Sequence, residues 1–202
     1  MSGYSSITTT VLLYSMYRST TTTTMAKTDS FFIRKALPLI SADGASGAGD
    51  FLEVGIDLGA YVDALGKAVL RIHNIAVQYS DAAGTTPQVK AGKPASADFQ
   101  LTTQTQTAIV VTGANKSVVA SGRMIAYNED ASDGVPSYVS DSLDNAPQRW
   151  DQGYLIGVEQ MYLSGATTTT GWEENITISL VMECTSETLS KEAAMALALS
   201  QQ

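Results

Sequence analysis

The sequence predicts an all-β protein whose strands form an antiparallel sandwich or barrel. Three observations lead to this prediction. Segments with β-branched or alternating apolar residues recur along the 202-residue chain, separated by stretches that contain Gly, Pro or Ser. Thr, Ser, Gly and Ala are abundant, a composition that favours β structure over a helical bundle. The strand-helix-strand alternation that builds a parallel sheet does not occur in the sequence.

The segment from Val69 to Tyr79 has the residue types of a central strand, with no Gly or Pro for eleven positions. Its alternation changes phase at His73-Asn74. Either both faces of the strand are buried, or a β-bulge re-aims its second half. We expect a bulge at His73-Asn74, with the apolar side chains on its two sides facing different layers. These side chains are Leu70 and Ile72 before the bulge, and Ile75, Val77 and Tyr79 after it.

Two strands are expected before this segment. Residues 31–41 form the first, and Pro38 marks an edge position or a bend because proline has no N–H to donate. Residues 50–59 form the second and alternate cleanly, as expected for a half-exposed strand. Its inward residues are Leu52, Val54, Ile56 and Leu58, while Glu53 and Asp57 face water.

Four or five further strands and a helix are expected after it. Residues 99–111 are predicted to be one long strand, joined by a turn to an antiparallel partner at 117–127. In the long break that follows, Tyr138 and Val139 indicate a brief strand. Residues 154–163 and 173–184 close the sheets. The second of these strands is expected to place its alternating apolar residues on one face: Ile176, Ile178, Leu180, Met182 and Cys184. A short helix then follows Ser190, whose side chain suits an N-cap.

These elements divide the chain into three parts. Residues 1–29 form a Thr- and Ser-rich N-terminal arm that cannot bury enough apolar surface to order itself. Residues 30–190 form the β-sandwich domain, and residues 191–202 form the C-terminal helix and tail. No apolar run approaches the ~20 residues of a membrane-spanning helix, so no membrane span is expected.

Charge limits the partners of the chain. The net charge is −8, yet the first 35 residues carry four basic side chains against one acidic side chain. An acidic body of this kind is a poor binder of phosphate backbones. Any nucleic-acid contact would be weak and would come from the N-terminal arm and the start of the first strand, through Arg18, Lys27, Arg34 and Lys35.

The low charge also indicates a homo-oligomer. Only 16% of the residues are charged, which is few for a monomer that must cover its whole surface. The arm contains an apolar segment that could add as a strand to the sheet edge of a neighbouring subunit. Trp150 and Trp172 suit anchors in a core or interface, or alternatively a sugar-stacking platform. The expected interface residues are Val11, Leu12, Leu13, Tyr14, Tyr17, Trp150 and Trp172.

Chemistry-bearing residues are sparse. His73 is the only histidine and has no catalytic partner near it in sequence, so a structural role is expected. Cys184 is the only cysteine and is expected to be a small buried side chain. No catalytic or cofactor-binding residues are therefore named, and the chain is not expected to be an enzyme. Acidic loops do bind calcium, and candidate ligands of an ion between subunits are Asp130, Asp133, Asp141 and Asp144.

The layout of residues 30–190 resembles that of a single jelly-roll viral capsid protein. The resemblance is carried by the entry strand FFIRKALPLI, the long strand VLRIHNIAVQY and the closing strand NITISLVMEC with its LSKEAAMALAL tail. It implies a jelly roll of about eight strands and a coat subunit of a virion that exchanges its arm with neighbours. The mildly basic arm departs from the strongly basic arm common in that family. Alternative functions are a carbohydrate-binding module, a virion decoration protein and a surface-layer subunit.

Overall fold

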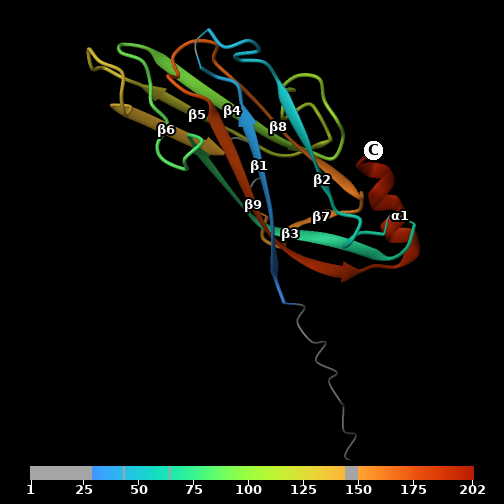
Figure 1. The fold of residues 1–202 in the computed structure, drawn as a ribbon. Helices are drawn as coiled ribbons and strands as arrows, with labels where there is room; N and C mark the ends of the chain where they lie inside the picture. The colour runs from blue at the N-terminus through green and yellow to red at the C-terminus, as the bar shows by residue number, and fades with distance from the viewer. Residues whose placement is uncertain (1–28, 43, 64, 144–149) are drawn as a thin grey trace, which may run out of the picture.

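The computed structural model describes residues 29–42, 44–63, 65–143 and 150–202. Within these ranges the chain forms nine strands and one helix (Figure 1). In chain order these are β1 (Phe31–Leu39), β2 (Leu52–Asp57), β3 (Ala68–Ser80), β4 (Pro94–Thr102), β5 (Val118–Tyr127), β6 (Tyr138–Leu143), β7 (Tyr154–Ile156), β8 (Gln160–Thr167), β9 (Ile176–Thr188) and α1 (Lys191–Ser200).

The strands form two antiparallel sheets that enclose one main core. The first sheet has the order β1-β9-β3-β7 and the second has the order β2-β8-β4-β5-β6. Alternation decides which side chains enter the core, because successive residues of a strand point to opposite faces. The predicted inward face of β9 is confirmed, since its five alternating apolar residues are all buried: Ile176, Ile178, Leu180, Met182 and Cys184. The prediction of an all-β sandwich is therefore confirmed.

The β-bulge expected in the central strand is present. Strand β3 pairs with β9, and the register shifts between Ile72 and Asn74, so that His73 is the extra residue. The prediction that the two halves of β3 face different layers is wrong. One inserted residue reverses the parity of all that follow, so both halves face the same core. Leu70 and Ile72 are buried in this core, and Ile75, Val77 and Tyr79 pack against it.

The predicted strand at 99–111 is wrong at both ends, although its pairing with β5 is confirmed. Strand β4 begins at Pro94 and ends at Thr102, after which the chain leaves the sheet. The carboxylate of Glu53 accepts hydrogen bonds from the Thr105 hydroxyl and from the backbone N–H of Gln106, the latter at 2.9 Å. These bonds hold residues 103–117 as a loop across the outer face of the sheet. They outweigh the β propensity of the Thr-rich segment.

The predicted strand at 154–163 is two strands in different sheets. Strand β7 pairs with β3, and β8 pairs with β2 and β4. The strand conformation is interrupted between them at Gly157, where a Cβ atom would lie 3.1 Å from the backbone nitrogen of Ala198. Helix α1 therefore packs directly against this break (Figure 1). The predicted N-cap is confirmed, since the Ser190 hydroxyl accepts a hydrogen bond from Ala193 N at 3.2 Å.

The loops at the other end of the sandwich are joined to one another by backbone hydrogen bonds. Val89 forms isolated bridges with Gly134 and with Trp172, which belong to the loops after β5 and β8. The Trp172 side chain is fully buried, and its Nε1 donates to Ser96 O at 3.0 Å. Trp172 is thus a core residue, and the predicted interface or sugar-stacking role has no exposed ring through which to act.

Candidate functional site

Residues 103–117 cover the middle of the outer face of the five-stranded sheet. The Gln100 side chain imitates a strand partner: its Nε2 donates to Val110 O at 2.6 Å, and its Oε1 accepts from Val110 N at 2.9 Å. The hydroxyl oxygens of Thr112 and Ser121 lie 2.9 Å apart. As a result Gln100 and Ser121 are buried although both point away from the core. The covering loop is therefore fixed to the sheet by polar side chains.

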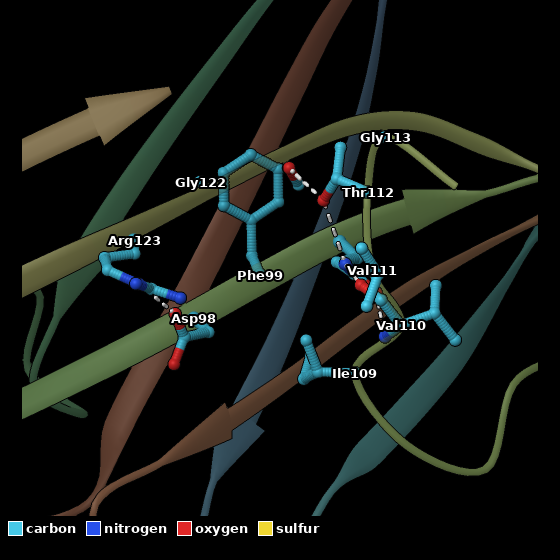
Figure 2. Close-up of a pocket in the computed structure, with 11 residues that line it drawn as sticks. Asp98, Phe99, Ile109, Val110, Val111, Thr112, Gly113, Gly122 and Arg123 are labelled. Carbon is cyan, nitrogen blue, oxygen red and sulfur yellow. Dashed lines mark hydrogen bonds and ion pairs between the residues drawn. The ribbon is translucent and has the colours of Figure 1, made fainter. Parts of the chain in front are cut away.

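A pocket of about 430 Å³ lies between this loop and the sheet (Figure 2). Its floor carries Asp98 and Arg123, which pair across β4 and β5 with Arg123 Nε 2.7 Å from Asp98 Oδ1. Its wall includes Ile109 and Val111, of which Val111 is 76% exposed. The carboxylate and guanidinium largely neutralise each other. The pocket thus offers apolar contact and a few hydrogen-bonding groups, and no pair of an activated nucleophile and a base lines it.

A second surface lies beside the pocket, at the margin of the same sheet, and we call it the β6 edge surface. It consists of the exposed apolar side chains of Ile125, Tyr127, Val135, Tyr138 and Val139. Tyr127 lies opposite Tyr138, so these two rings project from the outer face of the β5–β6 pair. Val139 lies opposite Ala126 and points to the inner face. Apolar side chains are therefore exposed on both faces of this margin.

The difference in width between the two sheets explains this exposure. The five-stranded sheet extends by one strand beyond the four-stranded sheet, and β6 pairs with β5 alone among the described strands (Figure 1). Ala126 on β5 is fully buried, whereas its neighbour Val139 on β6 is 45% exposed. The core thus ends at β5, and among the described residues no strand pairs with the outer edge of β6.

Carboxylates border the β6 edge surface. Asp141 is exposed on β6, and Glu129 and Asp130 are exposed in the turn that precedes it. The backbone N–H of Glu129 donates to Ser137 Oγ at 3.1 Å, which places Glu129 next to the start of β6. The surface is therefore apolar with an acidic margin.

Three of the four candidate calcium ligands are described, and within one chain these three do not form a metal site. Asp133 Oδ1 accepts a hydrogen bond from Ala91 N at 2.7 Å and so joins two loops. Asp130 donates its backbone N–H to Asn128 Oδ1, while Asp141 lies on β6. Asp144 lies outside the described residues. In ranges 29–42, 44–63, 65–143 and 150–202, no group of three or more His, Cys, Asp or Glu side chains is arranged to hold a metal ion.

The remaining predicted interface residues divide into two groups. Trp150 packs against the core and lies 5.3 Å from the Tyr154 ring, so only part of its indole is accessible. The predicted residues of the arm lie outside the described residues: Val11, Leu12, Leu13, Tyr14, Tyr17, Arg18 and Lys27. Of the basic residues predicted to contact nucleic acid, only Arg34 and Lys35 are described. They are consecutive on β1 and therefore point to opposite faces.

An ion pair joins β3 to β9 near the bulge. The Arg71 guanidinium contacts both carboxylate oxygens of Glu187, with Nη2 2.8 Å from Oε2, and also donates to Gln152 O. The hydrogen bond from Arg71 lowers the pKa of Glu187 below its ordinary value. His73 is exposed nearby, with Nε2 2.9 Å from Thr185 Oγ1. These contacts tie β3 to β9 beside the bulge and at the bulge itself.

Cys184 is buried in the core, as the sequence predicts. Burial raises the pKa of its thiol to about 12, with a smaller contribution from the charge of Glu183. The thiolate is the reactive form of cysteine. Cys184 is therefore unreactive in the folded chain.

Comparison with known proteins gives no family. No protein-family model matches the chain, and no curated protein matches it. Within the described part of the chain, no helix is long and apolar enough to cross a membrane.

The sequence contained one signal for the β6 edge surface. Residues Met124, Ile125, Ala126 and Tyr127 are apolar on both parities of β5. Met124 and Ala126 are buried, whereas Ile125 and Tyr127 point outward and are exposed. A strand with two apolar faces indicates contact on both faces. The sequence did not reveal which of these faces lacks a partner within one chain.

Proposed function

We propose that this protein is a structural, self-assembling subunit whose copies bury the β6 edge surface against one another. The observation that carries the proposal is a group of exposed apolar side chains on β6 and β5, at a sheet edge that has no further strand partner among the described residues. Large exposed apolar patches mark interaction sites, and open edges are templates for pairing with another chain. The low charge of the chain, with 16% charged residues, supports the same reading.

We further propose that the sandwich is a jelly roll. If β6 is set aside as an addition, eight strands remain. The first pairs with the last (β1 with β9), the second with the seventh (β2 with β8), the third with the sixth (β3 with β7), and the fourth with the fifth (β4 with β5). A long antiparallel hairpin rolled into two sheets has this pairing, which is the jelly-roll arrangement.

Within this class the proposed role is that of a viral capsid subunit located in the virion. Jelly rolls also occur in lectins and cupins, so the fold alone does not select the function. The burial of Trp172 removes the main motive for a carbohydrate-binding module. The open edge and the preceding N-terminal arm instead favour subunits that tile a shell. Arm exchange between neighbours belongs to this proposal.

The test is the mass and shape of the purified full chain, measured by size-exclusion chromatography with light scattering and by electron microscopy. We expect large, closed assemblies that form reversibly. Tyr138→Asp should weaken assembly, because it places a charge in the apolar contact. Leu65→Asp is the matched control, since Leu65 is exposed but lies outside the β6 edge surface. A dispersed 21.3 kDa monomer at high concentration would overturn the proposal.

A further inference from the structure

We infer that the β6 edge receives residues 11–17 of a neighbouring copy as an added strand. This inference rests on the proposed self-assembly and names the segment that covers the exposed surface. Strand β6 has six residues, which span about 20 Å. The segment Val11-Leu12-Leu13-Tyr14-Ser15-Met16-Tyr17 has seven residues and contains no Gly or Pro. Its length and composition therefore match those of the open edge.

The apolar pattern of the segment also matches the edge. A strand added to β6 presents its alternate residues to the two faces of the sheet. At β6 both faces are uncovered, with Tyr138 on the outer face and Val139 on the inner face. The segment is apolar on both parities: Val11, Leu13 and Tyr17 lie on one, and Leu12, Tyr14 and Met16 on the other. A half-polar strand would leave one of these faces exposed.

Charge favours the arm over a second β6 strand as the occupant. Pairing two β6 edges would bring the carboxylates of Glu129, Asp130 and Asp141 from both copies to one seam, where like charges repel. The arm continues into Arg18 and Lys27 without an intervening acidic residue. Residues 1–29 carry Arg18 and Lys27 against Asp29, a balance of +1, so the rest of the chain carries −9. The arm is thus the basic part of an otherwise acidic chain.

The other sheet edges are poorer acceptors. Strand β7 has only three residues, and β1 contains Pro38, which has no N–H to donate. Strand β2 ends the other margin of the same sheet and lies beside β1. Among the edge strands in the described part of the chain, β6 alone contains no proline and carries two exposed large apolar side chains, Tyr138 and Val139.

The position of the arm indicates a neighbouring copy. Strand β1, which follows the arm, lies beside β2, whereas β6 lies at the opposite margin of the sandwich. The thirteen residues 18–30 reach at most about 45 Å when extended. A domain of this size is about 40 Å across. The arm would have to pass around its own sandwich to reach its own β6, but it reaches an adjacent subunit directly.

The test is a cross-link between two separately made chains. One chain carries Ser15→Cys and the other carries Ser140→Cys, at the centres of the segment and of β6. The chains are mixed, allowed to assemble and treated with a short bifunctional maleimide. The native Cys184 does not react, because it is buried. Ser179→Cys on β9 replaces Ser140→Cys in the matched control, since Ser179 lies in the other sheet away from any edge.

We expect a covalent dimer from Ser15→Cys with Ser140→Cys and at least a tenfold lower yield with Ser179→Cys. Assembled particles without this cross-link would overturn the inference and leave the proposed function standing. Failure of the unmodified chain to assemble would instead overturn the proposed function. A single chain that carries both Ser15→Cys and Ser140→Cys tests whether the arm covers the β6 edge of its own chain. An intrachain cross-link in the dilute monomer would show this and would overturn the assignment to a neighbouring copy.

Discussion

The Gln201 side chain closes the break between the two sheets, and its removal should destabilise the fold. Gln201 is 4% exposed and follows directly after helix α1. Its Oε1 accepts from Gly157 N at 2.8 Å, and its Nε2 donates to Leu155 O at 2.7 Å. These backbone groups belong to the chain where it passes from β7 to β8. The Gln201 amide thus makes the hydrogen bonds that a neighbouring strand would make with the backbone of Leu155 and Gly157.

The cost of Gln201→Ala follows from these two bonds. A buried polar group left without a partner costs about 1–3 kcal/mol. The Gly157 N–H is buried and carries the full cost, whereas Leu155 O is only partly buried and gains access to water. We therefore expect a loss of about 2–4 kcal/mol from a total stability of about 5–15 kcal/mol. For a chain of this length the midpoint of thermal unfolding falls by roughly 5–15 °C.

Urea unfolding followed by circular dichroism measures this loss, with variants at equal concentration because assembly also stabilises the fold. Gln202→Ala is the control, because the Gln202 side chain is exposed and only its backbone oxygen is bonded, to Lys116 Nζ. The control should change stability by less than about 0.5 kcal/mol. A Gln201→Ala variant as stable as the control would refute the assigned role of the amide.

Three further changes test the packing and electrostatics of the fold. Gly165→Ala should cost about 1–3 kcal/mol in urea unfolding, because its Cβ would lie 2.9 Å from the backbone oxygen of Asp98 as well as 2.7 Å from Ile178 Cδ1; unchanged stability would contradict the packing. Because the pKa of Glu187 is lowered in the folded chain, ionised Glu187 stabilises the fold above the unfolded pKa, and this stabilisation is lost as pH falls through the folded pKa. Arg71→Met should therefore reduce the loss of stability between about pH 5 and about pH 3. Parallel plots of stability against pH for the two proteins would contradict this. Cys184 should resist a thiol reagent in the folded chain and react after unfolding, as mass spectrometry would show; rapid labelling of native protein would contradict its burial.

Residue patterns within single segments predicted two features of the fold, the core face of β9 and the bulge in β3. Alternation located the core face of β9, since five alternating apolar side chains all have the same environment. The phase change at His73 predicted the bulge, because an extra residue is the simplest way to keep an interrupted pattern paired. The same signal did not show that both halves of β3 face one core. The register with β9 shows that the extra residue returns the apolar pattern to a single face.

Long-range bonds explain the errors in the strand limits. The segment after Thr102 has strand-forming residues, but Glu53 and Gln100 hold it across the sheet instead. The break at Gly157 depends on Gln201, which lies 44 residues away along the chain. The β6 edge surface depends on the relative widths of two sheets. Its apolar residues were visible in the sequence, but their exposure follows only from the strand order.

Hydrogen exchange of the backbone amides in residues 138–143 measures whether copies of the chain bury the β6 edge between them. The full chain is compared as a dilute monomer and as a concentrated assembly, with β9 as the internal reference because it lies between β1 and β3 in both states. We expect the protection of the β6 amides to rise at least tenfold on assembly while the protection of the β9 amides stays constant. Equal exchange of β6 in both states would contradict the claim that this edge is buried between copies.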